Sequence, residues 1–130
     1  MARAYTVATA ALALQMPVKW VDNALSHNRV PGVHQERQGV ARRLTVDGLL
    51  ILAVASTLVR ELGVPLAVSL QVGQLLMRND GHYAVTAGVR LEVDLKNLRT
   101  ILLERLESAV EIAPIPKRGR PAKNKTGRLD

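Results

Sequence analysis

The run between Thr45 and Gly63 constrains the fold more than any other segment. Its longest apolar stretch, Leu49 to Val59, lies between a residue type that caps helix N-termini and a glycine that suits a helix C-terminus. The segment therefore predicts a helix over residues 46–62. Because the apolar stretch is shorter than a bilayer requires, we expect no membrane-spanning segment here.

Aromatic side chains are very scarce, with Tyr5, Trp20 and Tyr83 and no Phe, although nearly half of the residues are apolar. The core must then be built from Leu, Val, Ile and Ala, which is typical of packed helices. A chain of 130 residues has the size of one ordinary domain with a terminal extension. The sequence thus predicts a mainly α fold with small β-hairpins.

Residues that start or stop helices and strands set the expected order of elements. Thr6, Pro17 and Asp94 suit helix starts, and Gly39 suits a hairpin turn. We expect helices over 7–14, 17–27, 46–62, 65–77 and 95–111, and strands over 30–34, 40–44, 83–86 and 89–93. Two short helices followed by a hairpin predict a winged helix-turn-helix, and a second hairpin and a C-terminal helix follow it.

The formal net charge is +7 and the sequence pI is about 10.6, which is expected of a protein whose partner is a polyanion such as nucleic acid. After Pro116 the chain carries six Lys and Arg residues and one acid, Asp130. The rest of the chain is therefore nearly neutral, and any binding surface on it must come from a local cluster.

The second predicted helix offers such a cluster. Its helical spacing turns Lys19, Asn23 and Ser26 outward, where cations and amides match the groups exposed in the DNA major groove. Asp22 is discordant, because a carboxylate repels phosphates and accepts only from a cytosine amine. The alternative is a solvated helix face. The DNA-contacting residues expected at the end of this helix are His27 and Arg29.

The first predicted hairpin carries Arg37, Arg42 and Arg43. These arginines suit a wing that lies along the phosphate backbone or enters the minor groove. Alone, three arginines near a turn would indicate only a solvated loop. Beside a recognition helix, they favour contact with DNA.

The segment from Pro116 to Pro121 is similar to the core of an AT-hook. Glycine lets such a backbone sit deep in a narrow A·T minor groove, prolines keep it extended, and arginines run along the groove floor. The residues that would make these contacts are Lys117, Arg118, Gly119 and Arg120. The alternative is a basic solubilising tail, which would still add salt-sensitive affinity for DNA.

Residues 5–77 resemble the DNA-binding domain of the MerR family. The resemblance lies in Tyr5-Thr6-Val7, Met16-Pro17, the hairpin end Arg42-Arg43-Leu44-Thr45, and the junction Arg60-Glu61-Leu62-Gly63-Val64-Pro65-Leu66. It implies a winged-helix DNA-binding fold and dimers. The chain departs from the family at Val21-Asp22-Asn23, where an arginine and an aromatic pair are usual, so contacts made there do not carry over. Metal sensing is not implied, because the long dimer helix and the cysteine-rich loop are absent.

The last predicted helix has an apolar stripe that Ile101 and Leu103 widen beyond what one face of a small domain needs. We expect this stripe to be buried between two subunits. The predicted dimerisation residues are Leu95, Leu98, Leu102, Leu106 and Val110. The expected organisation is a DNA-binding domain over 1–78, a dimerisation element over 79–113 and a disordered basic tail over 114–130.

No arrangement of residues indicates catalysis. The chain has no cysteine, its histidines His27, His34 and His82 are widely spaced, and Ser26 and Ser69 have no obvious paired base. We therefore expect no enzyme activity, no cofactor and no metal. The absence of a signal-peptide pattern favours a cytoplasmic, nucleoid-associated protein.

The sequence thus predicts a sequence-selective double-stranded DNA-binding protein, a small dimeric transcriptional regulator. One alternative is an architectural or DNA-maintenance binder, of the excisionase or partition type, that uses the same surface. Another is an antitoxin-type interaction module whose C-terminal stripe holds a different protein.

Overall fold

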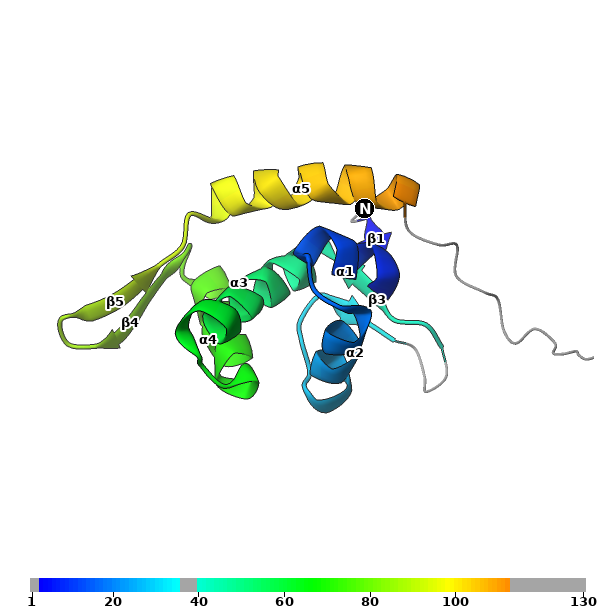
Figure 1. Cartoon of the computed structure of the whole chain (residues 1–130). Helices are drawn as coiled ribbons and strands as arrows, with labels where there is room; N and C mark the ends of the chain where they lie inside the picture. The colour runs from blue at the N-terminus through cyan, green and yellow to red at the C-terminus, as the bar shows by residue number, and fades with distance from the viewer. Residues whose placement is uncertain (1–2, 36–39, 113–130) are drawn as a thin grey trace, which may run out of the picture.

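The computed structural model describes residues 3–35 and 40–112, which form a mainly α structure with two small antiparallel sheets (Figure 1). The prediction of a mainly α fold with small β-hairpins is therefore confirmed. No helix in the described ranges combines the length and the apolar character needed to cross a membrane. The elements are β1 (Ala4–Tyr5), α1 (Val7–Leu14), α2 (Val18–His27), β2 (Val33–His34), β3 (Arg43–Thr45), α3 (Val46–Leu62), α4 (Leu66–Arg78), β4 (His82–Thr86), β5 (Val89–Glu92) and α5 (Leu95–Ile112).

Helix boundaries follow the capping residues. Thr6 accepts a hydrogen bond from the backbone N–H of Thr9 at 3.2 Å, and Thr45 caps α3 in the same way. Asp94 accepts from the N–H of Asn97 at 3.0 Å and so caps α5. These three predicted caps are confirmed. Pro17 and Pro65 lie one residue before α2 and α4 rather than inside them.

Helix α3 forms the centre of the core, and α5 runs along the molecule across α3 and α1 (Figure 1). Leu102 and Leu106 of α5 are each only 1% exposed, because the alanine-rich α1 lets α5 approach closely. The prediction that these two leucines lie between subunits is wrong, since the chain covers them itself. Among the other predicted dimerisation residues, Leu95 and Leu98 are half-buried and Val110 is exposed.

The first sheet has the strand order β1-β3-β2. Strand β1 was not expected. Strands β2 and β3 are shorter than the predicted 30–34 and 40–44. Strand β2 starts late because Gly32 adopts a left-handed φ of +87° that bends the chain just before it, and β3 begins at Arg43 and ends at Thr45. Leu44, fully buried, pairs with Tyr5 on one side and Val33 on the other, which joins this sheet to the core.

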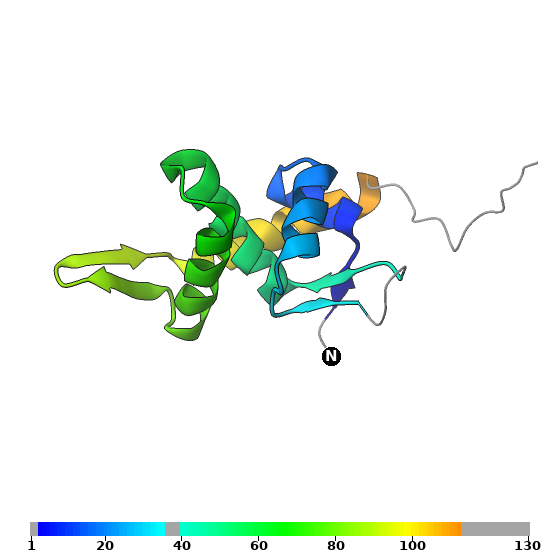
Figure 2. The same cartoon turned by 90° about the horizontal axis from the view of Figure 1, so that it is seen from below.

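The second sheet is the β4–β5 hairpin, which projects from the end of the molecule opposite α1 and α2 (Figures 1 and 2). At its base, Tyr83 and Leu91 pack against a small cluster from α3 and α4 that includes Leu58. Towards its tip, Val85 and Val89 are 49% and 53% exposed. The hairpin is thus anchored at one end only.

Candidate nucleic-acid interface

A tight turn joins α1 to α2. Gln15 takes a left-handed conformation at φ +58°, and the backbone N–H of Met16 donates to the carbonyl of Ala11 at 3.0 Å. Pro17 then leads directly into α2. The buried side chains of α2 are Val21, Ala24 and Leu25. The exposed ones that the sequence predicted for DNA contact are Lys19, Asn23, Ser26 and His27.

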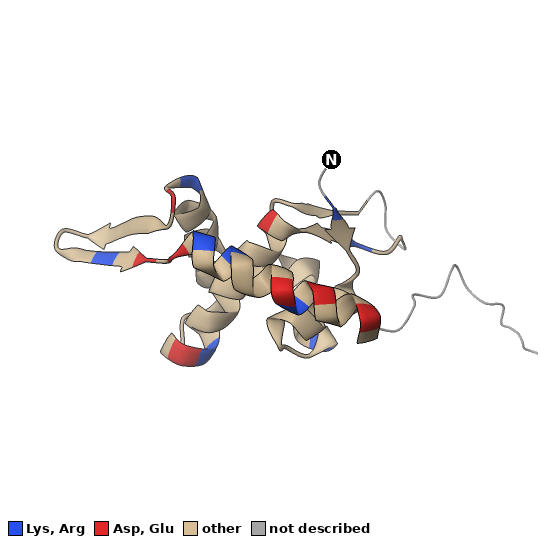
Figure 3. Cartoon of the chain, turned by 90° about the horizontal axis from the view of Figure 1, so that it is seen from above, with Lys and Arg blue, Asp and Glu red and all other residues tan. Residues whose placement is uncertain are grey.

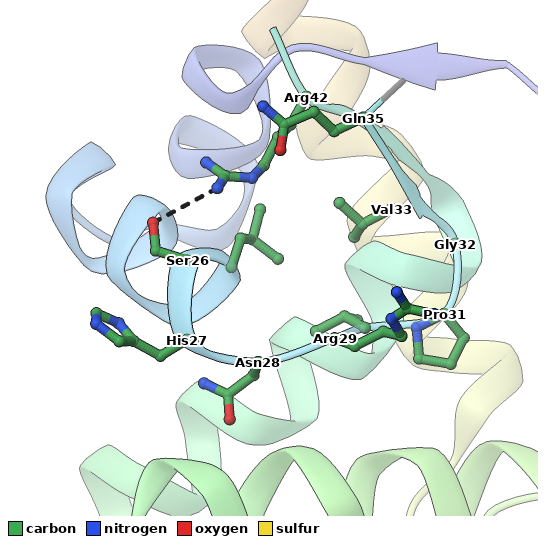
Figure 4. A pocket seen from close by; sticks show the side chains of 11 residues that line it. Ser26, His27, Asn28, Arg29, Pro31, Gly32, Val33, Gln35 and Arg42 are labelled. Atoms are coloured by element: carbon green, nitrogen blue, oxygen red, sulfur yellow. Dashed lines mark hydrogen bonds between the residues drawn. The ribbon is translucent and has the colours of Figure 1, made fainter. Parts of the chain in front are cut away.

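The β2–β3 hairpin contacts the polar face of α2 through Arg42. Its Nη2 donates to Ser26 Oγ at 3.5 Å (Figure 4). Its Nη1 lies 3.9 Å from Asp22 Oδ1. The Arg42 side chain is 23% exposed, less than that of Asp22 at 49%. Asp22, discordant as a DNA contact, thus faces this arginine at ion-pair distance.

A hollow of about 550 Å³ lies between the end of α2 and the hairpin (Figure 4). The buried Leu25 and Val30 contribute apolar surface to it. Its polar lining residues are Ser26, His27, Asn28, Arg29, Gln35 and Arg42. The described residues around the hollow thus include two arginines and no acid, a lining that suits an anionic group.

Gly32 fixes the hairpin to α3. Its carbonyl accepts hydrogen bonds from both the N–H and the hydroxyl of Thr45, at 2.8 and 2.9 Å. A Cβ at Gly32 would lie 2.6 Å from Gly48 N and from Thr45 Oγ1. This close approach, together with the positive φ, requires glycine at this position.

Charge is divided unevenly along the described chain (Figure 3). Residues 3–35 and 40–45 hold five Lys and Arg side chains against one acid, Asp22, whereas residues 46–112 hold six against eight acids. Within α2 itself Lys19 and Asp22 balance, so the basic excess of this part comes from Arg3, Arg29, Arg42 and Arg43, around the first sheet and the end of α2. Three of the acids lie in the last three turns of α5.

The structure brings together some of the predicted site residues. Ser26, His27, Arg29 and Arg42 surround one hollow, while Arg43 is exposed on β3. Lys19 and Asn23 are exposed on α2 but do not line the hollow. The predicted contacts Arg37, Lys117, Arg118, Gly119 and Arg120 lie outside the described residues.

Two lining residues were missed. Asn28 donates through Nδ2 to the carbonyl of Ala24 at 2.9 Å, a helix-terminal role that its position after the predicted helix could have indicated. Gln35 donates through Nε2 to the carbonyl of Val40 at 2.7 Å, and nothing in the sequence pattern marks it.

Within residues 3–35 and 40–112, no three His, Asp or Glu side chains gather closely enough to hold a metal ion. Comparison with known proteins yields no matching family model, no matching curated protein and no matching solved structure.

Proposed function

We propose that this chain is a sequence-selective double-stranded DNA-binding protein, a small dimeric transcriptional regulator, in which α1, α2 and the β2–β3 hairpin act as a winged helix-turn-helix. The observation that carries the proposal is the contact between Arg42 and Ser26, which joins the hairpin to the polar face of α2 in one basic surface. The sequence resemblance to the MerR family supports the same function. Such a protein would act in the cytoplasm, on the nucleoid.

In this proposal, α2 enters the major groove. Asn23 is a side chain that can donate to and accept from one adenine edge, and Lys19 can reach a guanine or a phosphate. Both are exposed on the helix. These residues would supply sequence preference, because base edges carry the information that phosphates lack.

The hollow beside α2 would receive a backbone phosphate. Arg29 and Arg42 both line it, and guanidinium groups bind phosphate oxygens through paired hydrogen bonds. Arg43, exposed on β3, would lie along the neighbouring backbone. These contacts would fix the orientation of α2 in the groove.

The test begins with selection of a preferred duplex from a random library by the full chain. Arg42→Ala and Arg43→Ala should then each weaken binding to that duplex about tenfold. Each should also reduce the steepness of the fall of log K with log salt by about 0.9, because binding with one phosphate contact fewer releases fewer counterions. Arg78→Ala is the matched control, because Arg78 is an exposed arginine at the end of α4.

The proposal fails if the library yields no preferred duplex, or if Arg42→Ala and Arg43→Ala bind with the affinity and salt slope of Arg78→Ala. A circular dichroism spectrum of each variant separates lost contacts from lost folding.

A further inference from the structure

The outer edge of β5 is an open strand edge. In the hairpin, Tyr83 pairs with Leu91, and the N–H of Val93 donates to the carbonyl of Gly81 at 2.8 Å. Because backbone groups alternate sides along an antiparallel strand, those of Arg90 and Glu92 point away from β4. No backbone hydrogen bond from the described residues outside the hairpin reaches either one. On β4 the outward N–H of His82 already donates to the carbonyl of Asn79 at 3.1 Å, so β5 is the edge with more backbone groups available for pairing.

Charge selects one register for pairing this edge with a second copy. Directly opposed residues of an antiparallel pair point their side chains to the same face of the sheet. A twofold axis perpendicular to the sheet must therefore lie midway between two copies of one residue, which oppose each other. With the axis at Arg90, the arginines of the two copies would lie opposite each other. With the axis at Leu91, Arg90 of each copy lies opposite Glu92 of the other copy, which gives two pairs of opposite charge. Arg90 and Glu92 are also the residues of β5 whose N–H and C=O groups point away from β4. In the register with the axis at Leu91, they can therefore exchange backbone hydrogen bonds between the two copies. Figure 3 shows the basic and acidic positions close together on the hairpin.

The same register covers exposed apolar surface. Val89 continues the β5 face that carries Leu91, but it extends past the body of the molecule and is 53% exposed. On β4 the register shift between Ala84 and Thr86 places Thr86 opposite it. With the axis at Leu91, Val89 of one copy lies opposite Val93 of the other. Val93 lines a mostly apolar groove of about 420 Å³, whose walls include Leu58, Leu62, Leu76 and Ile101. Val89 would therefore be seated at the mouth of this groove.

We propose that two copies of the chain join by antiparallel pairing of their β5 strands about Leu91, which produces a four-stranded sheet. This proposal rests on the homodimer proposed above and is independent of DNA binding. A two-stranded hairpin is marginal alone in water and gains from such pairing. Glu92 Oε2 lies 3.2 Å from His82 Nδ1 of its own hairpin. In the dimer, Oε1 of Glu92 would accept the hydrogen bond from Arg90 of the second copy.

The test exchanges the charges in the full chain and measures mass by sedimentation across a concentration series. Arg90→Glu and Glu92→Arg each create two like-charge oppositions and should raise the dimer dissociation constant about tenfold or more. The double variant Arg90→Glu/Glu92→Arg should return it to within about threefold of the unmodified chain. Arg105→Glu on α5 is the control for a charge reversal at an exposed position away from the hairpin.

Recovery in the double variant supports the proposal. A dimer that neither single change weakens overturns the β5 interface but leaves the homodimer standing. A chain that is monomeric at every concentration overturns both, and DNA binding to a short duplex is measured separately. Thermal unfolding of each variant shows whether a lost dimer reflects a lost fold.

Discussion

The two hairpins differ in both chemistry and attachment. The β2–β3 hairpin is joined to β1, to α3 through Gly32 and to α2 through Arg42, and its exposed side chains include Arg43. The β4–β5 hairpin is packed only at its base, and its exposed part carries Val85 and Val89. One hairpin therefore presents positive charge, and the other presents exposed valines and an open strand edge.

This difference is the reason for proposing a different partner for each hairpin. Cations held at fixed positions favour a polyanion, since little ordering is required on binding. An open edge with valines beside it favours another strand. In the two proposals above, hairpins at opposite ends of one chain therefore bind different kinds of partner.

The largest expected effect concerns α5, because its Leu102 is buried in the core of the chain. Leu102→Ala should lower the free energy of unfolding by about 3 to 5 kcal/mol, because it leaves a cavity between α5 and the core. Leu103→Ala, one residue along and 44% exposed, should cost less than about 0.5 kcal/mol. Urea denaturation of both variants measures this. Similar losses from the two changes would contradict the placement of α5.

The next effect compares one glycine from each hairpin. Gly32 and Gly88 have nearly the same φ, +87° and +85°, but an added Cβ would overlap Gly48 and Thr45 at the first position and meets no heavy atom within 4 Å at the second. Gly32→Ala should cost about 2 to 3 kcal/mol, through strain and overlap, and Gly88→Ala about 1 kcal/mol, through strain alone. Chemical denaturation gives both values. Equal costs would mean that the first hairpin is not held against α3 as described.

A smaller effect tests whether α2 is the element that discriminates between DNA sequences. Asn23→Ala should reduce discrimination between the selected duplex and a single-base mismatch about tenfold, with little change in non-specific binding. Asn97→Ala is the control, because Asn97 is an exposed asparagine beside the second hairpin. Fluorescence anisotropy with both duplexes measures the ratio. If Asn23→Ala discriminates as well as Asn97→Ala does, then Asn23 reads no base.

The smallest effect concerns the carboxylate near each hairpin arginine. Asp22→Asn should tighten binding to a short duplex about threefold, since it removes a negative charge from the proposed DNA-binding surface while keeping a polar partner for Arg42. Glu92→Gln should leave the affinity for a duplex with one half-site unchanged, because a single chain can bind it and β5 lies at the far end of the molecule from α2. Weaker binding by Asp22→Asn would show that holding Arg42 matters more than repulsion.

Local chemistry made the helices predictable. Thr6, Thr45 and Asp94 act within one turn of where they stand, and Gly63 ends α3 with a φ of +67°, so their effects can be inferred from neighbouring residues. Strand β1 depends on Tyr5 meeting Leu44 across a long stretch of chain, and a two-residue strand has no periodicity to detect.

The partners of each surface were harder to predict. Helical spacing showed that α5 has an apolar face, but not that the small side chains of α1 leave room for Leu102 and Leu106. In the candidate site, the exposed residues of α2 were predicted correctly as exposed. The contact between Asp22 and Arg42 depends on how the hairpin folds back on α2, which is a tertiary property.

Helix α3 connects the two hairpins and fixes the distance between them. Its first turn touches Gly32, and Val54 and Leu58 lie in the cluster beneath the second hairpin. With 17 residues, it is about 25 Å long. Because Leu49, Leu50 and Leu52 are completely buried along it, α3 cannot slide or shorten without opening the core. A pair of chains joined through β5 would hold their two α2 helices at one set separation, and inserting base pairs between two half-sites would abolish simultaneous binding.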